Sequence, residues 1–304
     1  MMNTTEYNRN FWNAMHRGAQ GDVALIPREG RHIMTGTFQL PAESGRKYIA
    51  KLEKDSLFRQ LATVVKAEQN DSHIWTFDSD DMADWVGDRP VDVRAGIDDF
   101  TRYETNVHKL AAMTRLGDDF TSDLKFDIED YLTTVFAKKF AKAEDNAFIN
   151  GDGVDKPAGI LHSEGGAEIG AAAATLTFDD ITKLYFSVKP EYCMGGSWLM
   201  NDETALYLRN LKDDAGSYLW RGSADTLLGK PVVISNEMPS IGKGAKPVAF
   251  GDFSYYWIIN RFPMTVKVLK EIFAMHGQNG YLAYEFLDGR LIRPEAIKVI
   301  QMAE

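Results

Sequence analysis

The run NGDG at residues 150–153 has residue types that could hold a metal ion or a phosphate. Asp152 and Asp155 are oxygen ligands suited to calcium, and glycine-rich turns occur in anion-binding loops. However, the run follows a helical pattern, whereas anions bind at the amino end of a helix, and it lacks the ligand spacing of an EF-hand loop. We therefore interpret it as a turn in which Gly and Asn supply the positive φ that caps the carboxyl end of the helix.

A second candidate is the acidic stretch DSDDMAD, whose carboxylates could bind a divalent cation or serve in a hydrolase or transferase. Asp78, Asp80 and Asp81 are suitable oxygen ligands, but no glycine follows at the position where a calcium-binding loop turns. Trp75 and Trp85 could stack on nucleic-acid bases, yet the acidic residues around them repel phosphates. Packing against a neighbouring subunit is our preferred interpretation of this stretch.

Nucleophiles and metal ligands are sparse. Histidines do not recur at metal-ligand spacing, and we interpret the single Cys193 as a buried structural thiol, with a Cys/His pair assembled by the fold as the alternative. The sequence has no nucleophile elbow, Walker loop or dinucleotide fingerprint, and GKGAK at 242–246 lies between expected strands without a following helix. We predict no catalytic, cofactor-binding or metal-binding residues, no cofactor and no enzymatic activity.

Composition restricts the class further. The formal net charge is −10, from 34 basic and 44 acidic residues, so the chain has no cationic excess with which to wrap a nucleic acid tightly. A container for nucleic acid would instead benefit from a wall that does not adhere to its contents. The lone cysteine excludes an intrachain disulfide and fits a reducing cytoplasm. The sequence shows neither a signal peptide nor a stretch of roughly 20 apolar residues, so we expect a soluble protein with no membrane partner.

The first third of the chain alternates between folded and projecting segments. Residues 1–45 show scattered aromatics without a sustained period, which favours an extended arm that packs on another surface. Residues 48–61 have helical spacing, and ATVV after them indicates a strand. The segment 68–100 carries ten acidic residues and cannot form its own core, so we expect a long projecting hairpin or loop. The strand after it should place Val107 and every second residue to Met113 on one face.

The clearest helix runs from Ile128 to Phe148, with Asp127 as its N-cap. About 21 residues at about 1.5 Å rise per residue give a rod of roughly 30 Å, which can serve as a spine for the fold. An apolar stripe with spacings of three and four runs along it: Ile128, Leu132, Val135, Phe136 and Phe140. Three lysines lie toward its far end, as the helix dipole prefers: Lys138, Lys139 and Lys142.

The second half of the chain alternates helices and strands. Residues 165–174, GGAEIGAAAA, favour a flexible small-residue loop. Thr177, with Asp180 three residues later, predicts a capped helix, and a strand GSWLMN and a third helix over 202–211 follow.

The remaining segments read as strands. KPVVIS, VAFGDFSYYWIINR and MTVKVLK are apolar or alternating and should be strands joined by Gly/Pro turns. The C-terminal part should be a hairpin turned at Asp288-Gly289. The fold class is α+β, with no internal repeat.

The order of these segments resembles the major capsid proteins of tailed bacteriophages with the Hong Kong 97 fold. The phrases that carry the resemblance are INGDG…KPAGIL at the end of the long helix, WLMN…LKDDAGSYL, LLGKPVVIS and FGDFSYYWIINR. The match runs from about Phe58 to Ile300. Its most telling pieces are Phe148 to Leu161, Trp198 to Leu219, Leu228 to Ser235 and 250–261.

The resemblance implies a wedge-shaped subunit whose extended loop lies over an adjacent subunit and whose axial domain converges at five- and six-fold axes. The segments it implies are an N-terminal arm (1–45), the start of a peripheral domain (46–67), an extended loop (68–105), the peripheral domain with its spine helix at 127–149 (106–165), an axial domain (166–260), and peripheral strands with a C-terminal hairpin (261–304).

The resemblance further implies a structural protein that self-assembles into hexamers and pentamers of an icosahedral virion shell around phage double-stranded DNA, contacted non-specifically. Assembly would occur in the bacterial host cytoplasm, with a scaffolding protein, a portal and a decoration protein as further partners. The alternative with the same fold is an encapsulin-like nanocompartment that encloses cargo enzymes. The N-terminal arm and the acidic loop favour the phage shell.

Two features depart from the family pattern. Family members often begin with a scaffolding region that a protease removes, whereas this chain opens almost directly at EYNRNFWNAMHRG; either scaffolding is a separate protein or this is not the full precursor. The type member also cross-links subunits through a loop lysine, an asparagine and a catalytic glutamate. Here the loop tip GDRPVDVRAGIDD has no lysine, Arg94 cannot replace it, and Tyr284 rather than Glu285 aligns with the glutamate. We predict no covalent cross-linking.

Overall fold

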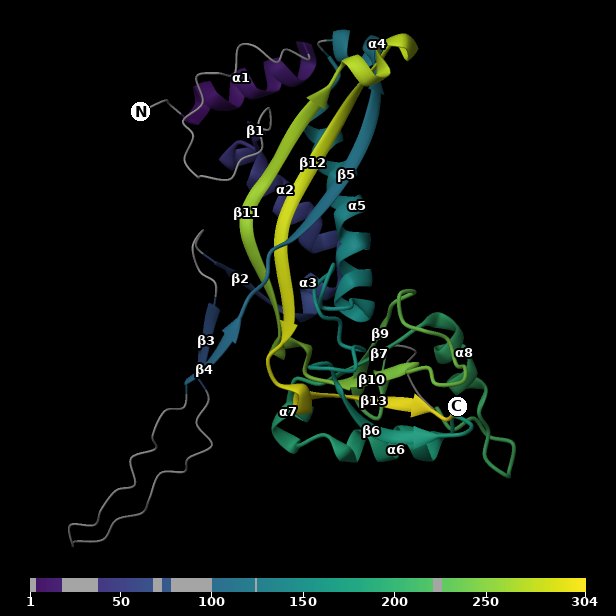
Figure 1. Ribbon diagram of the computed structural model, residues 1–304. Coiled ribbons are helices and arrows are strands. Elements are labelled where there is room, and N and C mark those ends of the chain that lie inside the picture. Colours follow the sequence, from purple (N-terminus) through teal and green to yellow (C-terminus); the bar gives the residue numbers. More distant parts are fainter. Residues whose placement is uncertain (1–3, 18–37, 68–72, 78–99, 124, 221–225) are drawn as a thin grey trace, which may run out of the picture.

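The computed structural model describes residues 4–17, 38–67, 73–77, 100–123, 125–220 and 226–304. These residues form an elongated subunit with two lobes, each built on its own sheet (Figure 1). In the described part of the chain, no helix is both long and apolar enough to cross a membrane.

The first lobe is built on a five-stranded sheet with two long antiparallel strands, β11 (Tyr256–Leu269) and β12 (Gln278–Leu291). β5 (His108–Gly117) pairs antiparallel with β12, and β1 (Phe38–Gln39) pairs antiparallel with β11. β2 (Thr63–Lys66) adds to β11 in parallel. The result is a narrow, tall sheet with one face available for helices.

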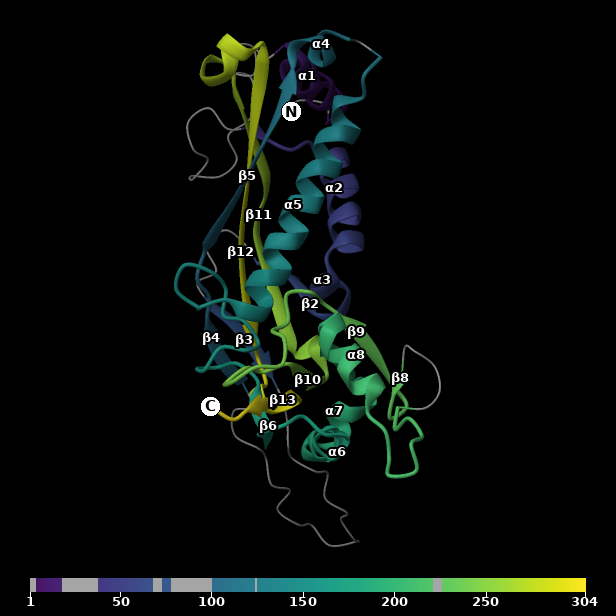
Figure 2. The ribbon, with the colours of Figure 1, turned by 90° about the vertical axis from the view of Figure 1, so that its right-hand side faces the viewer.

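Four helices cover that face: α1 (Thr4–Arg17), α2 (Ala42–Asp55), α3 (Leu57–Leu61) and α5 (Ile128–Asn150). α5 and α2 run beside each other along the sheet (Figure 2). As the stripe on α5 predicts, every member except the half-buried Val135 enters the core. We call this sheet with its four helices the spine lobe.

The second lobe is a six-stranded sheet in the order β6-β13-β10-β7-β9-β8. Its strands are β6 (Glu168–Ala173), β7 (Ser197–Met200), β8 (Thr226–Leu227), β9 (Lys230–Ile234), β10 (Val248–Gly251) and β13 (Ile297–Met302). The helices of this lobe are α6 (Phe178–Ser187), α7 (Pro190–Met194) and α8 (Asp202–Asn210). We call this unit the six-stranded lobe.

A shared apolar cluster joins the two lobes. Phe58 from α3, Phe148 from α5 and Tyr256 from β11 pack in it against Leu199 and Ala249 of the six-stranded sheet. Because both sheets contribute to one buried cluster, we expect the lobes to move little relative to each other within a subunit.

Several sequence predictions are confirmed. α2 and α3 occupy the expected helical region, and β2 follows them. Lys109, Ala111 and Met113 of β5 share the exposed face, as predicted, and Val107 just before the strand is also exposed. A two-stranded antiparallel stem, β3 (His73–Phe77) with β4 (Phe100–Glu104), lies within the expected hairpin. The residues between these strands lie outside the described part of the chain.

The prediction of an extended N-terminal arm is wrong for residues 4–17, which form α1. Phe11 and Met15 are fully buried in the same core as Tyr48, and Tyr281 Oη donates a hydrogen bond to the Met15 carbonyl at 2.9 Å. Tyr7, Phe11 and Met15 recur every four residues, so the helical signal is present but short. Residues 18–37 of the predicted arm lie outside the described residues.

The small-residue segment 165–174 is largely a strand rather than a flexible loop. β6 pairs in parallel with β13, and Gly170 fits where a Cβ would lie 2.5 Å from Ser187 Oγ and 2.6 Å from Leu184 Cδ1. Small residues are therefore used here because α6 packs closely on the strand.

The predicted C-terminal hairpin at Asp288-Gly289 is also wrong. β12 runs straight through both residues, which pair with Ile259 and Ile258 of β11. A Cβ at residue 289 would lie 2.5 Å from Tyr256 Oη, so glycine serves close packing there and not a turn. The final strand, β13, belongs to the other sheet.

β11 likewise joins two segments that we expected to be separate strands. It continues through Pro263, and its register against β12 shifts between Asn260 and Phe262 and again between Phe262 and Thr265. Proline lacks a backbone N–H, and an irregularity of this kind lets a strand accommodate it without ending. The short helix α7 was not predicted at all.

Candidate assembly site

The NGDG turn is explained by space and backbone geometry. Gly151 ends α5 with φ −66°, so the predicted positive-φ cap is wrong at this residue. Instead, a Cβ there would lie 1.8 Å from the Pro157 carbonyl oxygen and 2.4 Å from that of Ala147. The positive φ, +71°, occurs at Gly153. The glycines thus let the chain turn tightly and run back along the last turn of the helix.

The carboxylate in this turn is used by the turn itself. Asp152 Oδ1 accepts hydrogen bonds from the backbone N–H groups of Val154, Asp155 and Lys156 at 3.0, 3.1 and 3.1 Å. These bonds, the one from Val154 foremost, lower the pKa of Asp152. Across the described residues, no three His, Cys, Asp or Glu side chains are grouped to hold a metal ion. Asp78, Asp80 and Asp81 lie outside those residues.

The other sequence candidates also have structural roles. Cys193 is half-buried, its Sγ lies 3.5 Å from the Val188 carbonyl oxygen, and burial raises the pKa of the thiol. The GKGAK segment is a turn, as predicted, and Lys246 Nζ donates to the Leu161 carbonyl at 2.8 Å. A protonated thiol and a lysine bound to the chain's own carbonyl provide neither a nucleophile nor a phosphate loop.

Glu285 lies in a buried polar cluster at the base of the spine lobe. Arg59 donates from Nε and Nη2 to the two carboxylate oxygens of Glu144, both at 2.7 Å, and the two side chains are 1% and 0% exposed. Arg59 Nη2 also donates to Asn260 Oδ1 at 3.2 Å. Tyr48 completes the cluster from α2. Its hydroxyl and Glu285 Oε2 have no hydrogen-bond partner among the described residues.

Burial, together with the nearby charge of Glu144, raises the pKa of Glu285 to about 8. Burial lowers the pKa of Arg59, but the neighbouring groups, Glu144 foremost, raise it by a larger amount. The net effect is a raised pKa, so the guanidinium stays charged. The carboxyl of Glu285 is thus enclosed within the subunit, among side chains from α2, α3 and α5. Its neighbour Tyr284 instead carries Lys109 Nζ at 4.1 Å from its ring centroid.

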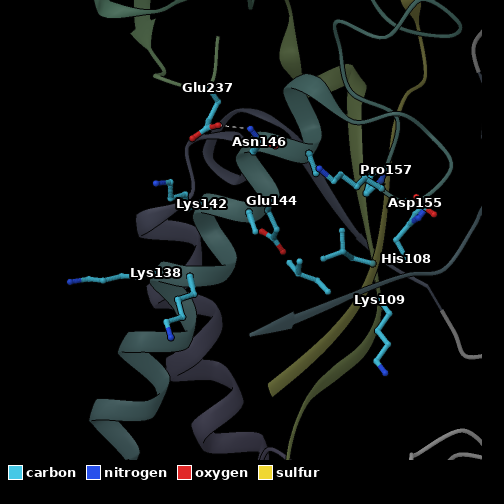
Figure 3. A pocket seen from close by; sticks show the side chains of 15 residues that line it. His108, Lys109, Lys138, Lys142, Glu144, Asn146, Asp155, Pro157 and Glu237 are labelled. Carbon is cyan, nitrogen blue, oxygen red and sulfur yellow. Dashed lines mark hydrogen bonds between the residues drawn. The ribbon is translucent and has the colours of Figure 1, made fainter. Parts of the chain in front are cut away.

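A recess lies beside the middle and end of α5, with a cavity volume of about 560 Å³. Five lysines border it, and we call it the lysine recess: Lys109, Lys138, Lys139, Lys142 and Lys156. Figure 3 shows side chains from α5, from the start of β5 and from the turn after α5 around this space. Asn146 Nδ2 donates to Glu237 Oε2 at 2.5 Å and closes one end.

The three α5 lysines were identified from the sequence, but we interpreted them as partners of the helix dipole. α5 continues to Asn150, and its last turn contains no basic residue, so the dipole explanation for Lys138, Lys139 and Lys142 is wrong. The four-residue spacing of Lys138 and Lys142 was the available signal. The Arg59–Glu144–Glu285 cluster left no such signal, because its members are 85 and more residues apart.

Exposed apolar side chains mark both ends of the molecule. At the end of the spine lobe formed by α4 (Asp118–Ser122) and the short helix η3 (Glu271–His276), Met275 is 98% exposed and Ile272 is 67% exposed. On the six-stranded lobe, Met194 of α7 is 85% exposed and Phe186 of α6 is 78% exposed. Apolar side chains exposed to this degree are typical of protein–protein contact surfaces.

Comparisons with known proteins agree with this geometry. A family model described as the phage capsid family matches residues 36–302. The chain is similar to a capsid chain of an empty GTA particle, with 28% identity, a TM-score of 0.66, and coverage of 94% of this chain and 99% of that one. It is similar to a chain from the native GTA particle, with 29% identity, a TM-score of 0.64, and coverage of 94% and 98%.

A structure from Gordonia phage Cozz shares the fold at 12% identity, with a TM-score of 0.58 and 94% coverage of both chains. A search of curated proteins found no match. The family model spans nearly the whole folded part of the chain, and the solved capsids match it from end to end. This protein is therefore a structural, major capsid protein that belongs to the phage capsid family.

Proposed function

We propose that the chain assembles into hexamers and pentamers of an icosahedral shell that encloses phage double-stranded DNA. The observation that carries this proposal is the likeness, over 94% of this chain, to capsid chains of GTA particles, both of them computed with C5 symmetry. Exposed apolar residues at both ends of the subunit support it, because a shell subunit needs contacts at each end.

The proposal assigns a position to each part of the subunit. The spine lobe is the peripheral domain, and the six-stranded lobe, centred on residues 166–260, is the axial domain near the symmetry axes. The loop 68–105, whose stem is β3 and β4, lies over an adjacent subunit. β13 pairs within the six-stranded sheet, so we place the last strand with the axial domain.

Further partners complete the proposal. A scaffolding protein, a portal and a decoration protein are candidate partners, DNA is contacted non-specifically, and assembly takes place in the host cytoplasm. The subunit has no enzymatic activity of its own. An encapsulin-like compartment is not favoured, because the family model and the similar structures are those of phage and GTA capsids.

Electron microscopy of the purified chain tests the assembly directly. We expect closed shells of uniform size, and light scattering should show a mass far above the 34.1 kDa of one subunit. A monodisperse monomer under every salt, pH and crowding condition tried would contradict the proposal.

Two variants and a denaturing gel of assembled shells test finer parts of the proposed function. Deletion of residues 86–98 should leave subunit folding intact and impair shell formation, and normal stable shells from the deletion would contradict the role of the loop.

Asp80→Asn with Asp81→Asn should leave assembly unchanged. Boiled shells should run as a single 34.1 kDa band, because we predict no cross-links.

A further inference from the structure

We propose that Arg261, Asp288 and Arg290 fix the direction in which the projecting hairpin leaves the subunit, by clamping residues 103–106 at its root. The root is the segment where β4 ends and the chain leads into β5. We call the three arginine and aspartate side chains, together with the four root residues, the root clamp. The inference concerns a single subunit and does not require the proposed shell.

The stem of the hairpin belongs to neither of the two large sheets. β3 and β4 pair with each other and with no other described strand, and Figure 1 shows the stem standing beside the long sheet. Trp75 of β3 is 55% exposed. A two-stranded hairpin is only marginally stable in water by itself. The direction of the stem therefore depends on contacts at its root.

Two contacts hold the last residues of β4. Tyr103 Oη donates a hydrogen bond to the Ile292 carbonyl at 2.9 Å. Arg290 Nη1 donates to the Glu104 carbonyl at 3.4 Å, and the guanidinium carbon lies 5.2 Å from the centre of the Tyr103 ring. Side chains of the stem and of the body thus both cross the joint, and they attach β4 to the end of β12.

Two further contacts hold the residues between β4 and β5. Arg261 Nη2 donates to the Thr105 hydroxyl oxygen and, at 3.4 Å, to the carbonyl of the same residue. The Asn106 N–H donates to Asp288 Oδ2 at 2.7 Å. Hydrogen bonds that involve a charged group are stronger than neutral ones. Four consecutive residues are therefore each bonded to the body of the subunit, which restricts rotation about the joint.

Asp288 is itself held firmly in the body. Its residue is 6% exposed, its Oδ1 accepts a hydrogen bond from the Gly289 N–H at 2.8 Å, and His108 Nε2 lies 3.5 Å from the same oxygen. A buried carboxylate is costly unless its oxygens accept hydrogen bonds, so releasing Asn106 from it is unfavourable. The Asp288-Gly289 pair, which does not form a turn, thus serves the root through its carboxylate.

Arg261 is the additional residue of a bulge in β11. Asn260 pairs with Leu287 and Phe262 pairs with Phe286, so β11 has one residue more than β12 at this point. A bulge of this kind redirects a side chain. Arg261 is only 6% exposed, and its guanidinium is directed to the root. The irregularity in β11 therefore has a second role besides accommodating the proline.

The residue before the bulged arginine attaches the other end of the hairpin. The N–H of Ala67, just before the hairpin segment, donates to the Asn260 carbonyl at 3.1 Å. The side chain of Asn260 accepts from Arg59, which binds Glu144. Adjacent residues of β11 thus hold both ends of the hairpin, and one of them is anchored in the buried ionic cluster.

A distance measurement between two spin labels tests the clamp on unassembled subunits. The labels are attached to Thr101→Cys on β4 and Lys54→Cys on α2, both at exposed positions, in a Cys193→Ser chain. Double electron–electron resonance should give a single narrow distribution of distances in this reference chain. Arg261→Met should widen the distribution about twofold, because Thr105 then loses its bonds to the bulge.

The matched control removes an arginine from the same sheet. Arg115→Met alters an exposed residue of β5 far along the strand from the root and should leave the distribution unchanged. Arg290→Met with Thr105→Ala changes the clamp without removing a fully buried side chain, and it should also widen the distribution. It decides the question if Arg261→Met does not fold. A broad distribution in the reference chain, or unchanged widths in the clamp variants, would overturn the proposal.

Hydrogen exchange provides a second readout of the same joint. Asn106 is exposed, yet its N–H should exchange slowly because it is bonded to a buried carboxylate. Asp288→Ala should speed this exchange about tenfold and leave the amides of α6, in the other lobe, unchanged. Fast exchange of Asn106 in the unmodified chain, or equal acceleration in α6, would contradict a local clamp. Both measurements use unassembled subunits, so failure to form shells would contradict the proposed function alone.

Discussion

The two lobes of this subunit use buried polar groups in different ways. In the spine lobe, Arg59 of α3 holds Glu144 of α5 through two buried hydrogen bonds, and Ser56 Oγ donates to Asp145 Oδ1 at 2.7 Å. These pairs connect helices more than 80 residues apart in the chain. In the six-stranded lobe, by contrast, the buried Asp180 is bonded to Thr177, three residues away.

The apolar cores differ in the same sense. The spine lobe assembles α1, α2, α5 and strands from residues 108–117 and 256–291. The six-stranded lobe is nearly continuous in sequence, and Trp198 packs there on Phe250 with ring centroids 4.3 Å apart. The difference teaches that the spine lobe contains a buried ion pair between distant helices, whereas the buried polar contacts of the six-stranded lobe are caps and neutral hydrogen bonds, such as that from Asn201 Nδ2 to Ser240 Oγ at 2.8 Å. Four variants test this contrast.

The largest effect is expected from Arg59→Met in the spine lobe. It leaves Glu144 and Glu285 buried without their cation, which should lower the free energy of unfolding by about 3–5 kcal/mol. Chemical denaturation of unassembled subunits, with hydrogen exchange of α5, measures the loss. Lys47→Met is the matched control: Lys47 Nζ and Glu129 Oε1 form a 2.8 Å surface pair, and its loss should cost only ~0–1 kcal/mol. Equal losses of unfolding free energy in both variants would contradict the special role of the buried ion pair in the spine lobe.

The second effect tests packing in the six-stranded lobe. Leu184 of α6 is fully buried, so Leu184→Ala should cost about 2–5 kcal/mol through lost burial and the cavity left behind. Hydrogen exchange should increase in α6 and β6 more than in α5. Leu206→Ala on the exposed face of α8 is the control, with an expected change near zero. Uniform exchange across both lobes would show that they unfold as one unit.

The contrast between lobes also explains what could be predicted from the sequence. Local signals succeeded: the Asp127 cap, the Thr177–Asp180 capping box and the α5 stripe all depend on residues within one or two turns. The prediction of a hairpin turn at Asp288-Gly289 was wrong. In the sequence, an Asp-Gly turn cannot be distinguished from a strand glycine that packs closely against another side chain. Only the fold brings Tyr256 against Gly289.

The candidate sites followed the same rule. The turn at GKGAK could be predicted from the sequence, because a phosphate-binding loop requires a helix directly after it and none is expected there. The Arg59–Glu144–Glu285 cluster could not be predicted, since its members meet only when α3, α5 and β12 pack together. The lysine recess is intermediate: Lys138 and Lys142 share a helix face, but Lys109 and Lys156 join them through the fold.

A third, pH-dependent effect comes from Glu285. Its folded-state pKa of about 8 lies above its ordinary value of 4.5, so the folded state holds a proton that the unfolded state releases. The contribution of Glu285 to stability is therefore fully present below about pH 4.5 and is lost as pH rises towards 8. Glu285→Gln imitates the protonated form and should remove this fall, so that the variant is more stable than the unmodified chain at pH 9 and little changed at pH 4.

Denaturation at a series of pH values measures that prediction. Glu164→Gln, on an exposed turn, is the control and should leave the pH dependence unchanged. A Glu285→Gln chain whose stability still declined between pH 5 and 8 like the unmodified chain would assign the pH dependence to other groups.

The smallest effect isolates a local cap in the six-stranded lobe. Thr177 Oγ1 accepts a hydrogen bond from the Asp180 N–H at 3.3 Å, and Asp180 Oδ2 accepts one from the Thr177 N–H at 3.1 Å. Thr177→Ala leaves one N–H of α6 without its partner and should cost about 1 kcal/mol, while Thr177→Ser keeps the hydroxyl and should cost less. Thermal denaturation of the three chains measures the difference. A loss as large as that of Arg59→Met would mean that this lobe, too, depends on one polar contact, because a cap acts only on the first turn of its own helix.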